Sequence, residues 1–130
     1  MIDRLRSVLE ADSRIAYALL FGSLGRGSAH VRSDTDVAIV LARGERLSAA
    51  DLGELLSRLE TAARGNVDLV LLDEAGPALA YRVFRDGRVV FERDRSALID
   101  RKARAILDYL DFRPVEETFT QAVLGAGRRG

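Results

Sequence analysis

Three aspartates stand where apolar segments of the chain begin. Asp34 and Asp36 precede and open the apolar segment 36–42, and Asp68 is the second residue of another apolar segment, 67–73. Because alternate residues of a strand point to the same face, Asp34 and Asp36 can project together, and Asp68 can join them if the two strands are neighbours. Three converging carboxylates repel one another unless a cation compensates them, and Mg²⁺ is commonly held by one or two carboxylates plus substrate phosphates. The spacing therefore predicts a metal site that a phosphate ligand completes.

The loop before these aspartates is rich in glycine and serine. Gly22, Gly25 and Gly27 allow tight backbone geometry and the close approach of a ligand. Backbone N–H groups after Gly22, together with the Ser23 hydroxyl, are suited to bind an anion, and Arg26 can reach a phosphate. Taken alone, such a loop is more simply a turn, and an Asp-x-Asp pair is often a solvated strand end. The combination of all these residues at strand ends favours a phosphate-binding site.

The elements that must position this site alternate between helix and strand. Apolar periodicity and capping signals predict the following elements: a helix from about 2 to 12, strands 15–21, 36–42 and 67–73, a helix from Ser48 to about 64, a helix after Gly76-Pro77, and a short edge strand 88–92. This order predicts an α/β fold with a short mixed central sheet flanked by helices. We expect one domain over residues 1–113 and a loosely ordered tail over 114–130.

A last helix is predicted from about Arg95 to Leu110. It is expected to bury five apolar residues: Leu98, Ile99, Ala103, Ile106 and Leu107. Three basic residues are interpreted as its exposed face: Arg101, Lys102 and Arg104.

Composition narrows the class of protein. The 130 residues include 20 Lys and Arg, 20 Asp and Glu, and no cysteine. The balanced charge argues against extended nucleic-acid binding, and the absence of cysteine excludes disulfides and thiolate metal sites. The chain has no apolar run long enough to span a bilayer and no leader-like start, so we expect a cytoplasmic protein without membrane contact.

Residues 15–73 resemble the nucleotidyltransferase superfamily with the DNA polymerase β-like fold. The signature of that superfamily is Gly-Ser, ten residues and Asp-x-Asp, which here reads Gly22-Ser23, residues 24–33 and Asp34-Thr35-Asp36. Asp68 matches the third carboxylate of the family, whereas Gly25 replaces a frequent alanine. The later segments "DGRVVFERD" and "ARAILDYLDFRP" are similar to the minimal nucleotidyltransferase (MNT) antitoxins of HEPN/MNT toxin–antitoxin pairs.

The resemblance implies a role for each candidate residue. Asp34 and Asp36 would hold Mg²⁺, with two ions expected, against the phosphates of ATP. Asp68 would join them at the second metal and help to deprotonate the attacking hydroxyl. Gly22-Ser23 would bind the β- and γ-phosphates with assistance from Arg26. The reaction would be an in-line attack on the α-phosphorus that releases pyrophosphate.

The acceptor is expected to come from another protein. The chain ends shortly after the expected core, which leaves little room for a built-in acceptor pocket. The resemblance implies a protein adenylyltransferase that acts as the antitoxin of a type VII-like pair, modifying a tyrosine of a HEPN ribonuclease toxin encoded nearby. Two alternatives stay open: an antitoxin that neutralises its toxin by binding alone, and a small-molecule nucleotidyltransferase of the aminoglycoside type. The three clustered carboxylates favour an enzyme.

Overall fold

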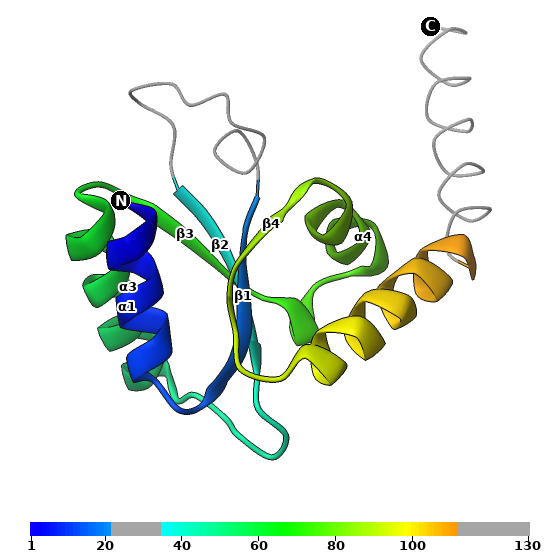
Figure 1. Cartoon of the computed structure of the whole chain (residues 1–130), viewed down its shortest axis with the longest axis horizontal. Coiled ribbons are helices and arrows are strands. Elements are labelled where there is room, and N and C mark those ends of the chain that lie inside the picture. The colour runs from blue at the N-terminus through cyan, green and yellow to red at the C-terminus, as the bar shows by residue number, and fades with distance from the viewer. Residues whose placement is uncertain (22–34, 112–130) are drawn as a thin grey trace, which may run out of the picture.

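The computed structural model describes residues 1–21 and 35–111, which form a four-stranded mixed sheet covered by helices on both faces (Figure 1). The elements are α1 (Ile2–Ala11), β1 (Ile15–Phe21), β2 (Thr35–Leu41), α3 (Ala49–Ala63), β3 (Val67–Leu71), the 3₁₀ turn η1 (Leu72–Glu74), α4 (Pro77–Asp86), β4 (Arg88–Glu92) and a helix over residues 95–111. The expected α/β fold with a short mixed sheet is confirmed. None of the helices in the described ranges combines the length and the apolar character needed to cross a bilayer.

The strand order is β3-β2-β1-β4, with β1 and β2 in the centre. β1 runs antiparallel to both β2 and β4, whereas β2 and β3 are parallel. A parallel pair needs a crossover connection, and α3 supplies it. The neighbouring position of β2 and β3 meets the condition that the sequence left open for Asp68.

Each face of the sheet carries its own apolar core. One core lies under α1 and α3 and contains Leu5, Leu9, Ile15, Ala18, Leu20, Val37, Ile39, Leu55, Leu59 and Val67. The other lies under α4 and the helix of residues 95–111 and contains Ala16, Tyr17, Leu19, Ala38, Val40, Leu72, Ala80, Val83, Phe84 and Ala105. Alternate residues of β2, and of β1 from Tyr17 onward, contribute to opposite cores, as the two-residue period of a strand requires. At the register shift between Ile15 and Tyr17, the consecutive residues Ala16 and Tyr17 both belong to the second core.

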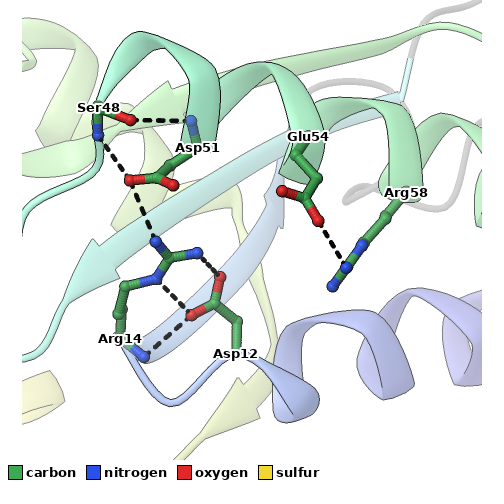
Figure 2. A network of polar contacts seen from close by, with 6 residues as sticks. All are labelled: Asp12, Arg14, Ser48, Asp51, Glu54 and Arg58. Carbon is green, nitrogen blue, oxygen red and sulfur yellow. Dashed lines mark hydrogen bonds and ion pairs between the residues drawn. The ribbon is translucent and has the colours of Figure 1, made fainter.

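A polar network ties the turn after α1 to the start of α3 (Figure 2). The Ser48 hydroxyl accepts a hydrogen bond from the Asp51 N–H, and the Asp51 carboxylate accepts one from the Ser48 N–H, which completes the predicted capping box. Arg14 bridges this cap to Asp12, with Nη1 3.2 Å from the Asp51 carboxylate and Nη2 2.8 Å from that of Asp12. Hydrogen bonds from Arg14 hold the pKa of Asp12 below its usual value.

The third strand is shorter than predicted. The last β2–β3 pair is Ile39 with Leu71, so the strand ends two residues before Asp73. The Leu72 carbonyl accepts hydrogen bonds from the Ala75 N–H and from Arg101 instead of from a neighbouring strand. These bonds replace strand pairing and turn the chain toward α4.

The last helix forms as predicted, but the prediction of its buried face was wrong. Four of its large apolar side chains are exposed: Ile99 (56%), Ile106 (37%), Leu107 (62%) and Leu110 (48%). Ala103, also expected to be buried, is exposed, whereas Leu98 is half-buried against the core, as expected.

The face that packs inward carries small residues and an arginine. Ala105 is almost fully buried and Ala97 packs against the same core. Arg101 was expected on an exposed basic face, but its side chain is only 15% exposed. Its Nη2 donates to the Leu72 carbonyl at 3.0 Å and its Nε to Asp73 at 3.3 Å. The small side chains allow close approach, and the guanidinium satisfies a carbonyl that the sheet leaves unused.

Candidate functional site

Two of the three predicted aspartates are neighbours at one end of the sheet. Asp36 on β2 and Asp68 on β3 are direct partners in the parallel register. Neighbouring strands lie about 4.8 Å apart, and paired residues point to the same face. The backbone therefore brings these two carboxylates together, as the sequence predicted.

Both carboxylates lie on the sheet face that α4 covers. In β2, Asp36 alternates with Val37 and shares its face with Ala38, which packs under α4. In β3, Asp68 shares its face with Val70, which packs against the same core. Asp68 is exposed and Asp36 is half-buried, so this corner of the sheet is open to solvent.

The start of the parallel pair is fixed by hydrogen bonds on both strands. The Thr35 N–H donates to the Asn66 carbonyl at 3.1 Å, and the Thr35 side chain is buried although it is polar. The Val67 N–H donates to the Glu60 carboxylate at 3.3 Å. Thr35 directly precedes Asp36, and Asn66 and Val67 precede Asp68 by two and one positions, so these bonds fix the strand starts next to the Asp36–Asp68 pair.

The strand that precedes the predicted phosphate-binding loop ends at the same corner. Phe21, the last residue of β1, pairs with Asp36. Gly22-Ser23 follow Phe21 directly in the chain, so the backbone places their starting point beside the carboxylate pair. Gly22, Ser23, Arg26 and Asp34 themselves lie outside the described residues, and their roles stay predictions.

The donor set of the pair fits a hard divalent cation. Carboxylate oxygens are the ligands that Mg²⁺ prefers, usually one or two of them with phosphate oxygens. Within residues 1–21 and 35–111 no group of three acidic, histidine or cysteine side chains lies close enough to hold a metal alone. A site built on Asp36 and Asp68 needs further oxygens, which the sequence assigns to Asp34 and to the substrate.

Two cavities lie at the opposite end of the sheet. One of about 390 Å³ is lined by the 42–47 turn, Leu71 and Asp73, and one of about 580 Å³ is lined by Ala42, Arg43 and residues near the start of the last helix. Neither includes Asp36 or Asp68. Both cavities lie by Leu41 and Ala42, at the end of β2 opposite Asp36, and so are separate from the carboxylate pair.

One surface feature was not anticipated from the sequence. The exposed side chains Ile99, Ile106 and Leu110 follow a seven-residue pattern along one side of the last helix. That spacing was present in the sequence, but it was assigned to the protein's own core.

Comparison with known proteins identifies what this arrangement is similar to. Residues 3–96 match the model of the family described as polymerase beta, nucleotidyltransferase. Among curated proteins, no sequence gives a match.

Similar solved structures cover nearly the whole chain. A toxin–antitoxin crystal structure with AMP-PNP matches with a TM-score of 0.81 at 22% identity, covering 95% of this chain and 98% of that one. The structure of a tri-AMPylated Shewanella oneidensis HEPN toxin in complex with an MNT antitoxin matches with a TM-score of 0.76 at 20% identity, covering 95% of each chain. A candidate minimal nucleotidyltransferase matches with a TM-score of 0.57 at 28% identity, over 66% of this chain and 88% of that one.

Proposed function

Because the chain belongs to the polymerase β-type nucleotidyltransferase family, we propose that it transfers AMP from ATP to a tyrosine of a HEPN ribonuclease toxin and thereby acts as its antitoxin. The observation that carries the proposal is the pairing of Asp36 with Asp68 in register, next to the end of β1 where the Gly-Ser loop begins. A domain without catalytic work gains nothing from two like charges on directly opposed residues, because such pairs are destabilising.

The solved relatives support the choice of nucleotide and acceptor. One relative was crystallised with AMP-PNP, an ATP analogue, and another was solved with a HEPN toxin that carries three AMP groups. Both share the fold of this chain over 95% of its length. The shared fold, together with the Asp36–Asp68 pair of this chain, favours the same reaction class here.

The reaction needs a phosphate-binding loop, a pair of carboxylates and an acceptor hydroxyl. Asp34, Asp36 and Asp68 would hold Mg²⁺, which when bound neutralises phosphate charge and stabilises the entering and leaving oxygens. The acceptor tyrosine oxygen forms a bond to the α-phosphorus while the bond from the α-phosphorus to the oxygen bridging the α- and β-phosphates breaks, and pyrophosphate leaves. The tyrosine proton passes to Asp68. Gly22-Ser23 orient the β- and γ-phosphates so that the leaving group is in line.

The test is intact-mass spectrometry of the protein encoded beside this one. That protein is incubated with this chain and Mg-ATP, with the Asp36→Ala variant as the matched control. A gain of one or more adenylyl groups that is absent from the control supports the proposal. A stable complex without any mass gain contradicts it and favours neutralisation by binding alone.

The small-molecule alternative is tested in the same way. Incubation with an aminoglycoside panel and Mg-ATP, followed by mass spectrometry of the small molecules, detects adenylylated drug. Modification of an aminoglycoside with no change in the neighbouring protein overturns the toxin assignment.

A further inference from the structure

The helix of residues 95–111 has a side on which large apolar side chains are exposed in the described part of the chain. Ile99, Ala103, Ile106 and Leu110 are spaced by four, three and four residues, which is the a/d pattern of a helix that packs along a partner helix. Leu107 flanks this line. We name these five residues the apolar stripe. Four of the six large hydrophobic side chains that are exposed in the described structure belong to it.

The stripe is separate from the helix's own packing. Leu98, Arg101 and Ala105 face the core, and on a helix with 3.6 residues per turn they lie on the side opposite the stripe. The residues that pack the helix against the core are therefore not those of the stripe. Apolar side chains retained in this pattern on the solvent side are typical of an interaction surface.

The helix lies outside the part of the chain that carries the family chemistry. The nucleotidyltransferase family model ends at residue 96, and the candidate minimal nucleotidyltransferase covers only 66% of this chain. The toxin–antitoxin structures cover 95%, so most of the helix is shared with them. The helix is thus part of the fold that this chain shares with the solved toxin–antitoxin structures.

The last helix and the carboxylates lie on the same side of the sheet. The last helix, drawn yellow to orange in Figure 1, packs on the face that α4 also covers. It begins near Ala42 and Arg43, at the end of the sheet away from Asp36 and Asp68, so a protein seated on the stripe must extend along this face to bring a hydroxyl to the carboxylates. The opposite face is covered by α1 and α3.

Charge gives the two sides of the stripe different character. Exposed Lys102 borders one side of the stripe, and exposed Asp100 borders the other. A partner helix with an acidic residue beside Lys102 is therefore attracted.

We propose that the apolar stripe is the surface on which the toxin docks, through an amphipathic toxin helix that has its own apolar stripe and an acidic residue opposite Lys102. This inference rests on the proposed function for the identity of the partner. Because a stable interface buries about 800 Å² on each side, the toxin also contacts surfaces beyond this helix. The stripe supplies the apolar centre of the interface.

The test measures binding and transfer separately. The double variant Ile106→Glu/Leu110→Glu is compared with Arg104→Glu, a matched exposed substitution on the same helix away from the stripe. Affinity for the neighbouring gene's product is measured by calorimetry, nucleotide binding with a fluorescent ATP analogue, and folding by circular dichroism. The stripe variant is expected to bind the toxin about 20-fold more weakly or worse, while Arg104→Glu changes affinity by less than about threefold. Both should fold and bind nucleotide normally, because neither change touches the core or the carboxylates.

The measured affinities and oligomeric states either support docking by the stripe or contradict it. If the stripe variant binds the toxin as tightly as the unmodified chain does, docking by the stripe is wrong. If light scattering shows that the chain alone is a dimer and that the stripe variant is a monomer, the stripe is a self-association surface and the proposal is also wrong. The Asp36→Ala variant, which leaves the stripe intact, separates failure of the proposed AMP transfer from failure of docking. A complex that requires the stripe but never transfers AMP, even from the unmodified chain, leaves docking intact and removes the adenylyltransferase. Replacing Lys102 with Glu should weaken toxin binding, and this loss of affinity should grow as the salt concentration falls, because charges are screened less at low salt. An apolar contact alone does not predict such a salt dependence.

Discussion

Replacing Asp68 with Asn should stabilise the nucleotide-free protein while weakening its response to Mg-ATP. Asp68 and Asp36 are direct partners on adjacent parallel strands, so their negative charges are held close together by the backbone. Removing one charge relieves that repulsion. It also removes a carboxylate that the proposed function assigns to the metal.

The size of each effect follows from the geometry. Like charges on directly opposed strand residues cost about 0.2–1 kcal/mol, and the exposure of Asp68 places the cost near the lower end. A gain of about 0.4 kcal/mol corresponds to a rise in Tm of about 1–2 °C for a chain of this length. At a nucleotide concentration of about 100 times its Kd, Mg-ATP adds about 2.7 kcal/mol to the unmodified protein, and a tenfold loss of affinity reduces this to about 1.4 kcal/mol.

The assay is thermal unfolding of both proteins, first in EDTA and then in Mg-ATP. The variant should melt slightly higher than the unmodified protein in EDTA and clearly lower in Mg-ATP, so the order of the two reverses. Glu74→Gln, which neutralises an exposed acidic residue in the turn after β3, is the matched control and should leave the order unchanged. Equal stabilisation of the Asp68→Asn variant and the unmodified protein by Mg-ATP would refute the assignment of Asp68 to the nucleotide site.

Three further predictions concern the fold that supports the site. Gly87→Ala should lower the free energy of unfolding by about 1–3 kcal/mol, measured by urea denaturation, because a Cβ there overlaps the Val83 carbonyl oxygen; an unchanged midpoint would contradict this. Tyr17→Phe should leave stability unchanged or raise it by up to about 1 kcal/mol, since the buried hydroxyl has no hydrogen-bond partner among the described residues, and a clear loss in calorimetry would reveal a partner. Asp12→Asn should lower the free energy of unfolding by about 1 kcal/mol at neutral pH and should make that free energy depend less on pH in the acid range. Hydrogen bonds from Arg14 lower the pKa of Asp12, so its contribution is complete above about pH 4–5 and is lost as pH falls through the lowered pKa; parallel acid curves for both proteins would show that the pair does not contribute.

The strands and the carboxylate pair were accessible from sequence because strong local signals agree there. β1 is a continuous apolar run that ends at a glycine, and such runs are typical of a central strand buried on both faces. Asp68 sits at the second position of β3, and Asp36 sits at the second position of β2. In the observed parallel pair the strand starts match, so equal positions become partners. The predicted strand 36–42 began one residue late, and matched starts in the predicted strands would have opposed Asp36 to Val67, so the sequence brought the aspartates to the same corner but did not give their exact register.

The last helix shows what sequence could not decide. It has two apolar sides, one around Leu98 and Ala105 and one around Ile99 and Ile106. Both satisfy helical periodicity, and the larger side chains were assigned to the core. In the structure the side with Leu98 and Ala105 packs inward, and Arg101 on that side donates to the Leu72 carbonyl. That contact spans 29 residues, and no local pattern encodes it.

The edge position of β3 gives the site a thermodynamic property of its own. Within the described sheet β3 pairs with β2 alone, whereas β1 and β2 each have strands on both sides. An edge strand separates from its sheet at a lower free energy than the whole domain unfolds, so its amides exchange with solvent by local opening. A carboxylate on that strand is lost to the site whenever the edge opens, even though the rest of the fold persists. A bound nucleotide that engages both Asp36 and Asp68 therefore joins the edge to the centre of the sheet, and slower amide exchange in β3 would be the direct record of an occupied site.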